Sequence, residues 1–347
     1  MRRTVALAVA LLILPTLALA APPAWKAPRN AFGQPDFSGV WSNATITRLE
    51  REPRFGDRLV LTSDEARSLE GVNDARNARL RAPTDQTKKV DDLPECQSGA
   101  QGAACGYNAF WTDPGTRLIR IGPEVRSSIL VEPRNGRLPL RPEAMARIRA
   151  RFGNSEVGNF DGPERRAVGE RCLVGFGGTS GPPMLPVLYN NHYQIQQTGE
   201  AVVILVEMVH DARIVRLGGA HPGKSVRTWM GDSIGHWDGD TLVVETTNFR
   251  ADQTFRGATD DMTVVERFTR ISPRQILYQF EVIDPATFSA PVKGEQALNA
   301  TRDPIYEYAC HEGNYAMRGI LAGAREEEAH GRELAGNRGE VTEEGEP

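Results

Sequence analysis

The most regular pattern of hydrophobic and polar positions lies in the middle of the chain. Residues 201–209 (AVVILVEMV) are apolar or β-branched at almost every position, which is typical of a strand covered on both faces. The turn residues Thr198-Gly199-Glu200 precede this run, so the pattern predicts a hairpin with residues 193–197. Because strand side chains alternate, we expect His210 and Glu207 on opposite faces of the continued strand.

A second hairpin is predicted around Asp238-Gly239, the preferred two-residue turn. This turn pairs Trp237 with Asp240, and counting outward places His236 and Glu245 on one face of the sheet. We expect that face to look into an enclosed small-molecule pocket. A histidine and a glutamate on a partly apolar face form either a hydrogen-bonded structural pair or an acid/base pair.

Alternating segments separated by turns continue on both sides of this region. Strands are predicted at residues 117–121, 127–131, 262–270, 275–283 and 292–299, and helices at 63–79 and 142–152. A third helix carries Met317, Ile320, Leu321 and Ala324 on one stripe. No fixed-period repeat occurs. The sequence therefore predicts a mainly β protein, an antiparallel meander forming a barrel or strongly curved sheet of about eight to ten strands, with a few peripheral helices.

The ends of the chain differ from its middle. Met1-Arg2-Arg3, an apolar run and Ala18-Leu19-Ala20 predict a cleaved signal peptide over residues 1–20. We expect an irregular segment with one helix at 21–109, the antiparallel β domain and its C-terminal helix at 110–324, and a disordered acidic tail at 325–347.

These features predict a periplasmic or extracellular location. The apolar run is too short for a membrane anchor. The formal net charge of −4 becomes about −6 once Arg2 and Arg3 are removed, which argues against nucleic acid as a partner. The expected partner is a small-molecule substrate or ligand, and the sequence makes no prediction of the oligomeric state.

Four cysteines in an exported chain predict two disulfides. Local spacing favours Cys96 with Cys105 and Cys172 with Cys310, and two other connectivities are possible. No CxxC or CxxCH motif occurs, which excludes thioredoxin-like redox, zinc-ribbon and c-type haem sites.

The candidate chemistry is acid–base catalysis without a cofactor, as in a hydrolase, lyase or isomerase, because a histidine beside a carboxylate exchanges protons near neutral pH. The candidate catalytic residues are His210, His236, Glu207 and Glu245. Aromatic side chains would form apolar walls and an arginine would hold an oxyanion. The candidate substrate-binding residues are His192, Tyr193, Arg213, Arg216, Trp229 and Trp237.

Three alternatives use the same barrel. In a non-catalytic, lipocalin-like carrier, the histidines and glutamates are satisfied core groups around an apolar ligand. In a metal-dependent enzyme, His192, His210 and His236 converge on a metal ion, although no HxH or HExxH spacing supports this. An envelope scaffold without a ligand would have a filled barrel interior.

The loop at residues 175–186 (GFGGTSGPPMLP) is the richest in glycine and proline. It matches neither a GxSxG nucleophile elbow nor a GxxxxGK[ST] phosphate loop. We expect it to form the rim of a pocket.

The segments PDFSGVW, NNHYQI, HDARIVRL, GHWDGDTLVVETTNF and YACHEGNY together resemble an uncharacterised family of exported bacterial proteins. The resemblance covers nearly the whole mature chain and implies common ancestry and export, but no activity or catalytic residue. Gly39-Val40-Trp41 is also similar to the Gly-x-Trp of lipocalins, in which the tryptophan plugs the base of the barrel. We expect Phe37 and Trp41 to be core anchors.

Overall fold

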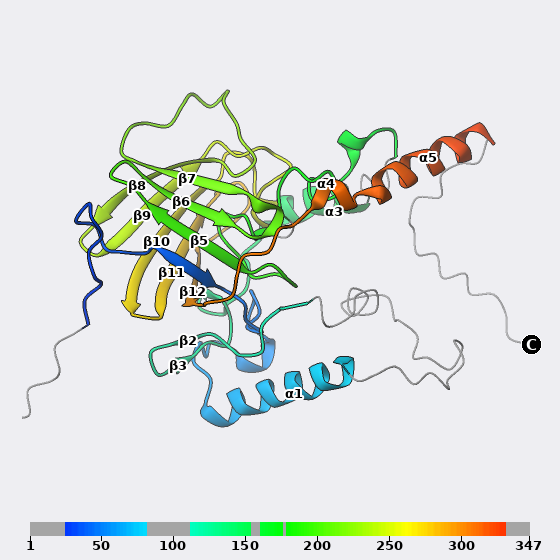
Figure 1. The fold of residues 1–347 in the computed structure, drawn as a ribbon. Helices are drawn as coiled ribbons and strands as arrows, with labels where there is room; N and C mark the ends of the chain where they lie inside the picture. The colour runs from blue at the N-terminus through cyan, green and yellow to red at the C-terminus, as the bar shows by residue number, and fades with distance from the viewer. Residues whose placement is uncertain (1–24, 82–111, 154–159, 176–177, 331–347) are drawn as a thin grey trace, which may run out of the picture.

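The computed structural model describes residues 25–81, 112–153, 160–175 and 178–330. Its centre is a closed barrel of nine strands (Figure 1), so the predicted fold class is confirmed. Around the barrel the strands are β1 (Gly39–Ser42), β5 (His192–Gln197), β6 (Ala201–Val206), β7 (Ala212–Leu217), β8 (Asp232–Asp238), β9 (Thr241–Thr247), β10 (Thr263–Ser272), β11 (Gln275–Ile283) and β12 (Val292–Ala300). β12 pairs with β1 and closes the ring.

One strand pair in the barrel is parallel, which differs from the predicted antiparallel meander. β7 and β8 run in the same direction, whereas every other neighbouring pair in the ring is antiparallel. An odd number of strands cannot close with antiparallel pairs alone. Residues 218–231 therefore cross back along the barrel before β8 begins, as a parallel connection requires.

The tight turns β5–β6, β8–β9 and β10–β11 lie at one end of the barrel, which we call the turn end; the longer connections lie at the opposite loop end. At the loop end, the short strand β4 (Leu130–Glu132) pairs with β12 beyond its contact with β1. Outside the barrel, β2 (Arg120–Ile121) and β3 (Glu124–Val125) form a small separate ribbon.

The β8–β9 hairpin forms as predicted, but its register differs by two. Trp237 pairs with Leu242, and the loop residues are Gly239 and Asp240. The Asp240 carboxylate accepts a hydrogen bond from Arg29 in the N-terminal segment. A shift of two leaves each side chain on the predicted face, because strand faces alternate with period two.

Large side chains fill the barrel interior. Inward positions alternate along the strands, as in Val202, Ile204 and Val206 of β6. Gly294 of β12 lies opposite Phe280 of β11 and leaves room for its ring, since a Cβ at Gly294 would lie 2.2 Å from Phe280 Cζ. A filled interior is the feature expected of a scaffold, so a ligand site has to be sought at the ends or on the outside of the barrel.

The N-terminal segment closes the turn end. Phe37 and Trp41 are buried, which confirms the prediction of core anchors. The Phe37 ring lies 5.5 Å from Trp237, and the Arg270 guanidinium lies over the Trp41 ring at 5.3 Å. This tryptophan therefore lies at the turn end of the barrel.

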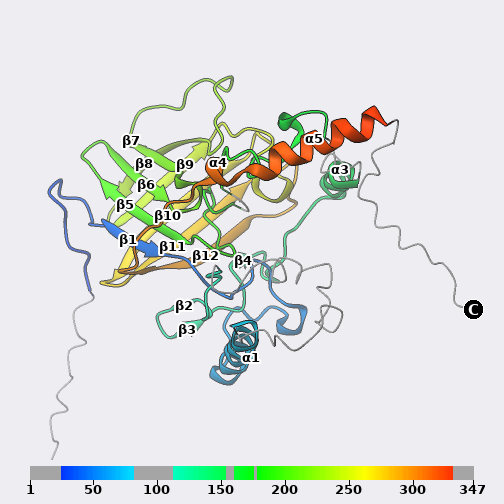
Figure 2. The ribbon, with the colours of Figure 1, turned by 45° about the vertical axis from the view of Figure 1, so that its right-hand side comes forward.

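Helices lie only at the periphery (Figures 1 and 2). They are α1 (Ser63–Arg81), α3 (Pro142–Gly153), α4 (Cys310–Gly313) and α5 (Tyr315–Ala329). α1 lies near the β2–β3 ribbon, and α5 projects from the loop end with Ala324 buried. The expected disordered tail lies mostly outside the described residues, although α5 continues past residue 324. No helix in the described ranges is long and apolar enough to cross a bilayer.

Candidate functional site

His236 and Glu245 share a face, but this face is the solvent-exposed outside of the barrel. Both residues are exposed, and His236 pairs with Val243 rather than with Thr241. The Glu245 carboxylate lies 3.4 Å from His221 Nε2. The expectation that His236 and Glu245 look into one enclosed space was therefore wrong, because the buried face of this hairpin carries Leu242 and Val244.

His210 lies on a short turn after the strand, not on the strand itself. β6 ends at Val206, and the segment Met208–His210 forms a 3₁₀ turn (η7) with positive φ at Val209 and His210. Strand alternation stops there, so His210 is exposed instead of following the inward face of Val206. The neighbouring Asp211 accepts hydrogen bonds from Ser180 Oγ at 2.5 Å and from the Gly175 backbone N–H at 3.0 Å. Burial raises the pKa of the Asp211 carboxyl.

His192 and Glu207 are the candidate residues that the structure brings into direct contact. His192 Nδ1 lies 2.8 Å from Glu207 Oε2, and its Nε2 lies 3.9 Å from the exposed carboxylate of Asp303. The other Glu207 oxygen accepts a hydrogen bond from the Tyr306 backbone N–H at 3.1 Å. This pair fastens residues 301–309, which run outside the barrel, to β5 and the end of β6.

The contact between His192 and Glu207 shifts both pKa values. The hydrogen bond that His192 donates to Glu207 raises the pKa of His192, although burial opposes the shift. Burial would raise the pKa of Glu207, but the hydrogen bonds from His192 and Tyr306 outweigh it and lower this pKa. A neutral His192 would donate from Nδ1 and leave Nε2 able to accept a proton, which is the arrangement of an oriented general base.

Arg213 and Tyr193 belong to the barrel core. Arg213 is paired with Glu266, donating from Nη1 to Oε1 at 2.9 Å and from Nη2 to Oε2. Ser233 and Thr246 accept further hydrogen bonds from this guanidinium. Glu266 raises the pKa of Arg213 even though burial alone would lower it.

Tyr193 and Tyr278 each make buried hydrogen bonds, and Tyr278 belongs to the Arg213–Glu266 network. The Tyr193 hydroxyl donates to the Thr179 carbonyl at 3.0 Å, and burial raises its pKa. Tyr278 donates its hydroxyl hydrogen to Glu266 at 2.8 Å and accepts from the Met184 backbone N–H. The predicted roles of Tyr193 and Arg213 in binding would thus require access to a buried core.

The remaining candidates, Arg216, Trp229 and Trp237, do not form a common site. Arg216 donates from Nη2 to both carboxylate oxygens of Asp232, and this carboxylate also accepts from His221 Nδ1 at 2.7 Å. Trp229 lies in the crossover segment, with the Arg250 guanidinium 4.1 Å from its ring. Trp237 packs at the turn end, and the described residues provide no hydrogen-bond partner for its buried ring nitrogen.

The metal alternative depends on histidines that are not grouped. Among the described residues, no three or more His, Cys, Asp or Glu side chains form a set that could hold a metal ion. His192 lies beneath the 301–309 segment, His210 on the η7 turn and His236 on the outer face of β8.

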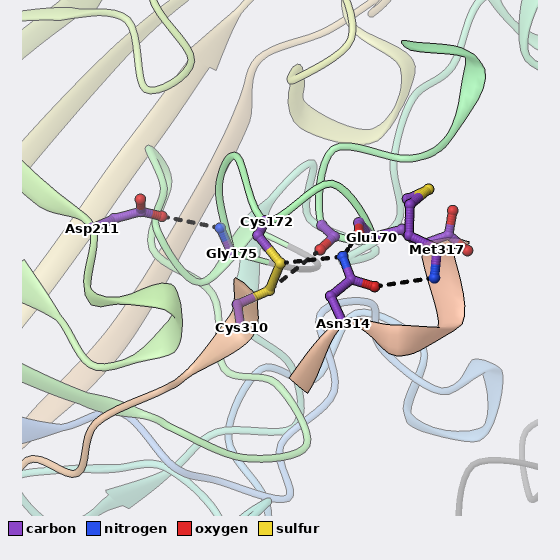
Figure 3. The surroundings of a disulfide bond; sticks show 8 residues. Glu170, Cys172, Gly175, Asp211, Cys310, Asn314 and Met317 are labelled. Carbon is purple, nitrogen blue, oxygen red and sulfur yellow. Dashed lines mark hydrogen bonds between the residues drawn. A yellow bond between two sulfur atoms is a disulfide. The ribbon is translucent and has the colours of Figure 1, made fainter. Parts of the chain in front are cut away.

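The long disulfide is confirmed. Cys172 and Cys310 are bonded, with a Cα–Cα distance of 5.7 Å (Figure 3). Asn314 begins α5 by accepting from the Met317 backbone N–H and donates its amide to the Glu170 carbonyl. The bond therefore joins the C-terminal helices to the segment before the glycine-rich loop. The predicted Cys96–Cys105 bond lies outside the described residues.

A candidate ligand site is a hollow of about 540 Å³ at the loop end, which we call the end pocket. Three segments surround it, namely α3 with the chain before it, the glycine-rich loop and the β9–β10 connection. Its lining residues are Leu138, Leu140, Met145, Ile148, Gly178, Gly181, Pro182, Pro183, Leu185, Asp252, Gln253, Thr254, Phe255, Arg256 and Gly257. The prediction that residues 175–186 shape a pocket rim is confirmed for the described part of that loop.

The glycine-rich loop separates the end pocket from the barrel interior. Met184 is fully buried; its N–H donates to Tyr278, and its carbonyl accepts from Gln296 at 2.7 Å. Leu185 follows Met184 and faces the pocket. On the opposite wall, Gly257 lies against Ile148, since a Cβ at Gly257 would lie 2.5 Å from Ile148 Cδ1.

Sequence reasoning missed most of the pocket walls. Met145 and Ile148 are three residues apart on α3 and so lie on one face of the helix, a signal that was present. Phe255 and Arg256 lie in an irregular connection without any period, so their place could not be read from the pattern. The buried Glu266 gave no signal either, because its partner Arg213 is far away in the sequence.

No protein-family model matches the chain, and no curated protein or solved structure is significantly similar to it.

Proposed function

We propose that this protein is exported and binds a small, largely apolar molecule in the end pocket. The observation that carries the proposal is the volume of about 540 Å³ walled mainly by leucine, isoleucine, methionine, phenylalanine and proline. Ligand pockets are typically about 300–1,000 Å³ in volume, with apolar walls and a few polar groups. The filled barrel interior directs this proposal to the end of the barrel instead of a lipocalin-like central cavity.

The composition of the wall favours binding over acid–base catalysis at this place. Its described lining contains no histidine, glutamate or cysteine, and the Asp252 carboxylate is 3.6 Å from Arg250. A general base would have to face the cavity. A carrier needs only apolar walls, so a carrier is the form of the proposal that this geometry supports best.

Titration with the neutral fluorophore N-phenyl-1-naphthylamine tests the proposal. We expect saturable binding at one molecule per chain, with increased fluorescence. Met145→Trp fills the pocket from α3 and should abolish this binding, because the added ring occupies the space of the ligand. Ala146→Trp places the same ring on the exposed side of the same helix and should leave the binding intact.

Two results would refute binding at the end pocket. One is the absence of saturable fluorescence in the folded wild-type protein. The other is equal binding by the Met145→Trp and wild-type proteins, with circular dichroism showing that both are folded.

A second candidate function is acid–base catalysis at His192. It is supported by the Glu207 carboxylate on Nδ1 and by the orientation of Nε2 toward the edge of residues 301–309. We expect His192→Gln to lower the rate of p-nitrophenyl acetate hydrolysis at least tenfold, since general bases typically contribute about 10²–10⁴-fold. His236→Gln removes an exposed imidazole and serves as the control. Equal rates in the three proteins would refute this function.

Export is supported by the N-terminal pattern and by the Cys172–Cys310 bond, since disulfides persist in oxidising compartments. Expression of the full chain in a secreting bacterial host should yield a periplasmic or extracellular protein whose first residue is Ala21. Recovery in the cytoplasm with residues 1–20 retained would contradict export.

A further inference from the structure

The end pocket adjoins a second hollow with a different chemistry. The second hollow has a volume of about 380 Å³, and four arginines line it with two glutamates. Leu138 and Arg256 line both hollows. A ligand in the end pocket would therefore have its apolar part among leucine, isoleucine and phenylalanine and one end beside arginine side chains.

We infer that the end pocket takes an anionic amphiphile, a molecule with an apolar body and one carboxylate, and that Arg256 holds the carboxylate. This inference rests on the proposed function, because it names the class of ligand for the same pocket. Arginine presents its N–H donors in a planar fork that matches the two oxygens of a carboxylate.

The backbone of Arg256 is held in a conformation that is rare for residues other than glycine. Its φ of 46° and ψ of 42° lie in the left-handed region. The preceding Phe255 is buried, with its ring centroid 6.4 Å from that of Phe280 and 6.2 Å from that of Phe288. Such conformations persist where the surrounding structure imposes them, and they are frequent at ligand sites. The packing of Phe255 thus fixes where the Arg256 side chain begins.

The Arg256 guanidinium has no partner to neutralise it within the described part of the chain. No hydrogen bond or ion pair joins it to another described residue. The nearby acids are already engaged. Glu52 lies 2.9 Å from Arg54, and Glu50 accepts from the Leu138 N–H at 2.7 Å. A carboxylate that enters the pocket therefore meets an unpaired cation at the border of the two hollows.

The other arginines of the second hollow add positive charge near the position that we assign to the ligand carboxylate. Arg51 is buried and donates to Ser128 Oγ and to backbone carbonyls, so it keeps its charge without a carboxylate partner. Arg48 and Arg137 make only long contacts of 3.8 and 3.7 Å with Glu52 and Glu50. The local field thus favours an anion over a neutral or cationic head group.

The test compares decanoate with decanol, which share a chain and differ in head group. Each is used to displace bound N-phenyl-1-naphthylamine from the full-length exported protein at low ionic strength. We expect decanoate to bind about fivefold more tightly than decanol, the size typical of one solvent-exposed ion pair. Added salt should reduce this preference, because salt screens exposed charges.

Variants at Arg256 test whether this residue binds the carboxylate head group. Arg256→Gln should remove the preference for decanoate and leave the affinity for decanol unchanged. Arg256→Lys should keep most of the preference for decanoate. Arg267→Gln makes the same charge change on the outside of β10 and should keep the full preference.

The outcomes separate this inference from the proposal on which it rests. Equal displacement by decanoate and decanol, or a preference that survives in Arg256→Gln, would overturn the inference and leave binding at the end pocket standing. If the fluorophore, decanoate and decanol all fail to bind, both the inference and the proposed function are refuted.

Discussion

At the scale of single residues, the Arg213 guanidinium is a buried charge that has to be compensated inside the barrel. It is 2% exposed, and the Glu266 carboxylate opposite it is fully buried. Each donor nitrogen of Arg213 has an acceptor on Glu266, Ser233 or Thr246. A buried charge is tolerated only when it is paired and hydrogen-bonded. The sequence predicted Arg213 as a ligand-binding residue, whereas in the structure its role is to pair with Glu266 inside the barrel.

We expect Arg213→Leu to destabilise the protein by about 3–5 kcal/mol, because Glu266 would remain buried without its counter-charge. The double variant Arg213→Leu/Glu266→Leu should be more stable than Arg213→Leu alone. Urea unfolding followed by tryptophan fluorescence measures both. A double variant that is less stable than the single one would show that the lone Glu266 is not the source of the loss.

The His192–Glu207 pair predicts a pH-dependent stability. Because the pKa of His192 is raised above 6.5 in the folded protein, its contribution is present below about pH 6.5 and is lost as the pH rises through the raised value. The pKa of Glu207 is lowered below 4.5, so its contribution is lost only as the pH falls through that lowered value.

His192→Gln should therefore lower the free energy of unfolding most between about pH 5 and 6.5, and the difference from wild type should shrink above this range. His236→Gln, which removes an exposed imidazole, is the matched control. A loss in His192→Gln that is the same at pH 5.5 and pH 9 would contradict the assigned ionisation.

At the scale of strands and helices, the sequence predicted the elements better than the side of the sheet that is buried. The hairpin at Gly239 and the helices α1 and α3 form close to the predicted bounds. Period-two alternation assigns residues to two faces but does not say which face is concave. The prediction placed the pocket on the face of His236 because that face carries polar side chains, whereas the buried face is the one that carries Leu242.

Tertiary contacts determine features of these elements that the local sequence pattern does not predict. The positive φ values at Val209 and His210 end the inward alternation of β6, which no local pattern indicated. The partner of Arg213 is Glu266, 53 residues further along the chain, and alternation within one strand cannot identify so distant a partner. The candidate site was predictable from the composition of the glycine- and proline-rich loop and from the helical spacing of Met145 and Ile148, but not in the irregular β9–β10 connection.

Packing between β11 and β12 gives an element-scale prediction. Gly294→Ala places a Cβ against the Phe280 ring and should destabilise the barrel by about 1–3 kcal/mol, the range for overpacked cores. Gly294→Ala combined with Phe280→Leu should recover part of this loss, because the smaller side chain relieves the contact. Thermal unfolding by circular dichroism compares the three proteins. Equal stability of Gly294→Ala and wild type would refute the close packing.

At the scale of the whole molecule, the described chain is one closed barrel whose turn end is covered by the N-terminal segment and whose loop end is covered by the glycine-rich loop (Figure 2). The Cys172–Cys310 bond fastens the C-terminal helices to that loop end. The barrel thus serves as a rigid support, and the ligand site proposed above lies among the connections that it holds in place.

Removal of that bond tests its contribution. The cysteines are 138 residues apart in the sequence, and the chain-entropy model gives about 5 kcal/mol as the upper limit of stabilisation for a loop of this length. Cys172→Ser/Cys310→Ser should lower the midpoint of thermal unfolding, and a reducing agent should lower it to a similar value in the wild-type protein. An unchanged midpoint in both cases would contradict a stabilising role.

Photolabelling tests most directly whether the end pocket is the binding site. The full-length protein is irradiated with a small apolar diazirine, with and without excess N-phenyl-1-naphthylamine, and the labelled peptides are mapped by mass spectrometry. Our account predicts label on Met145, Ile148, Leu185 or Phe255 that the fluorophore suppresses. Suppressible label on the outer face of β8 and β9, around His236 and Glu245, with none on the pocket walls would contradict it.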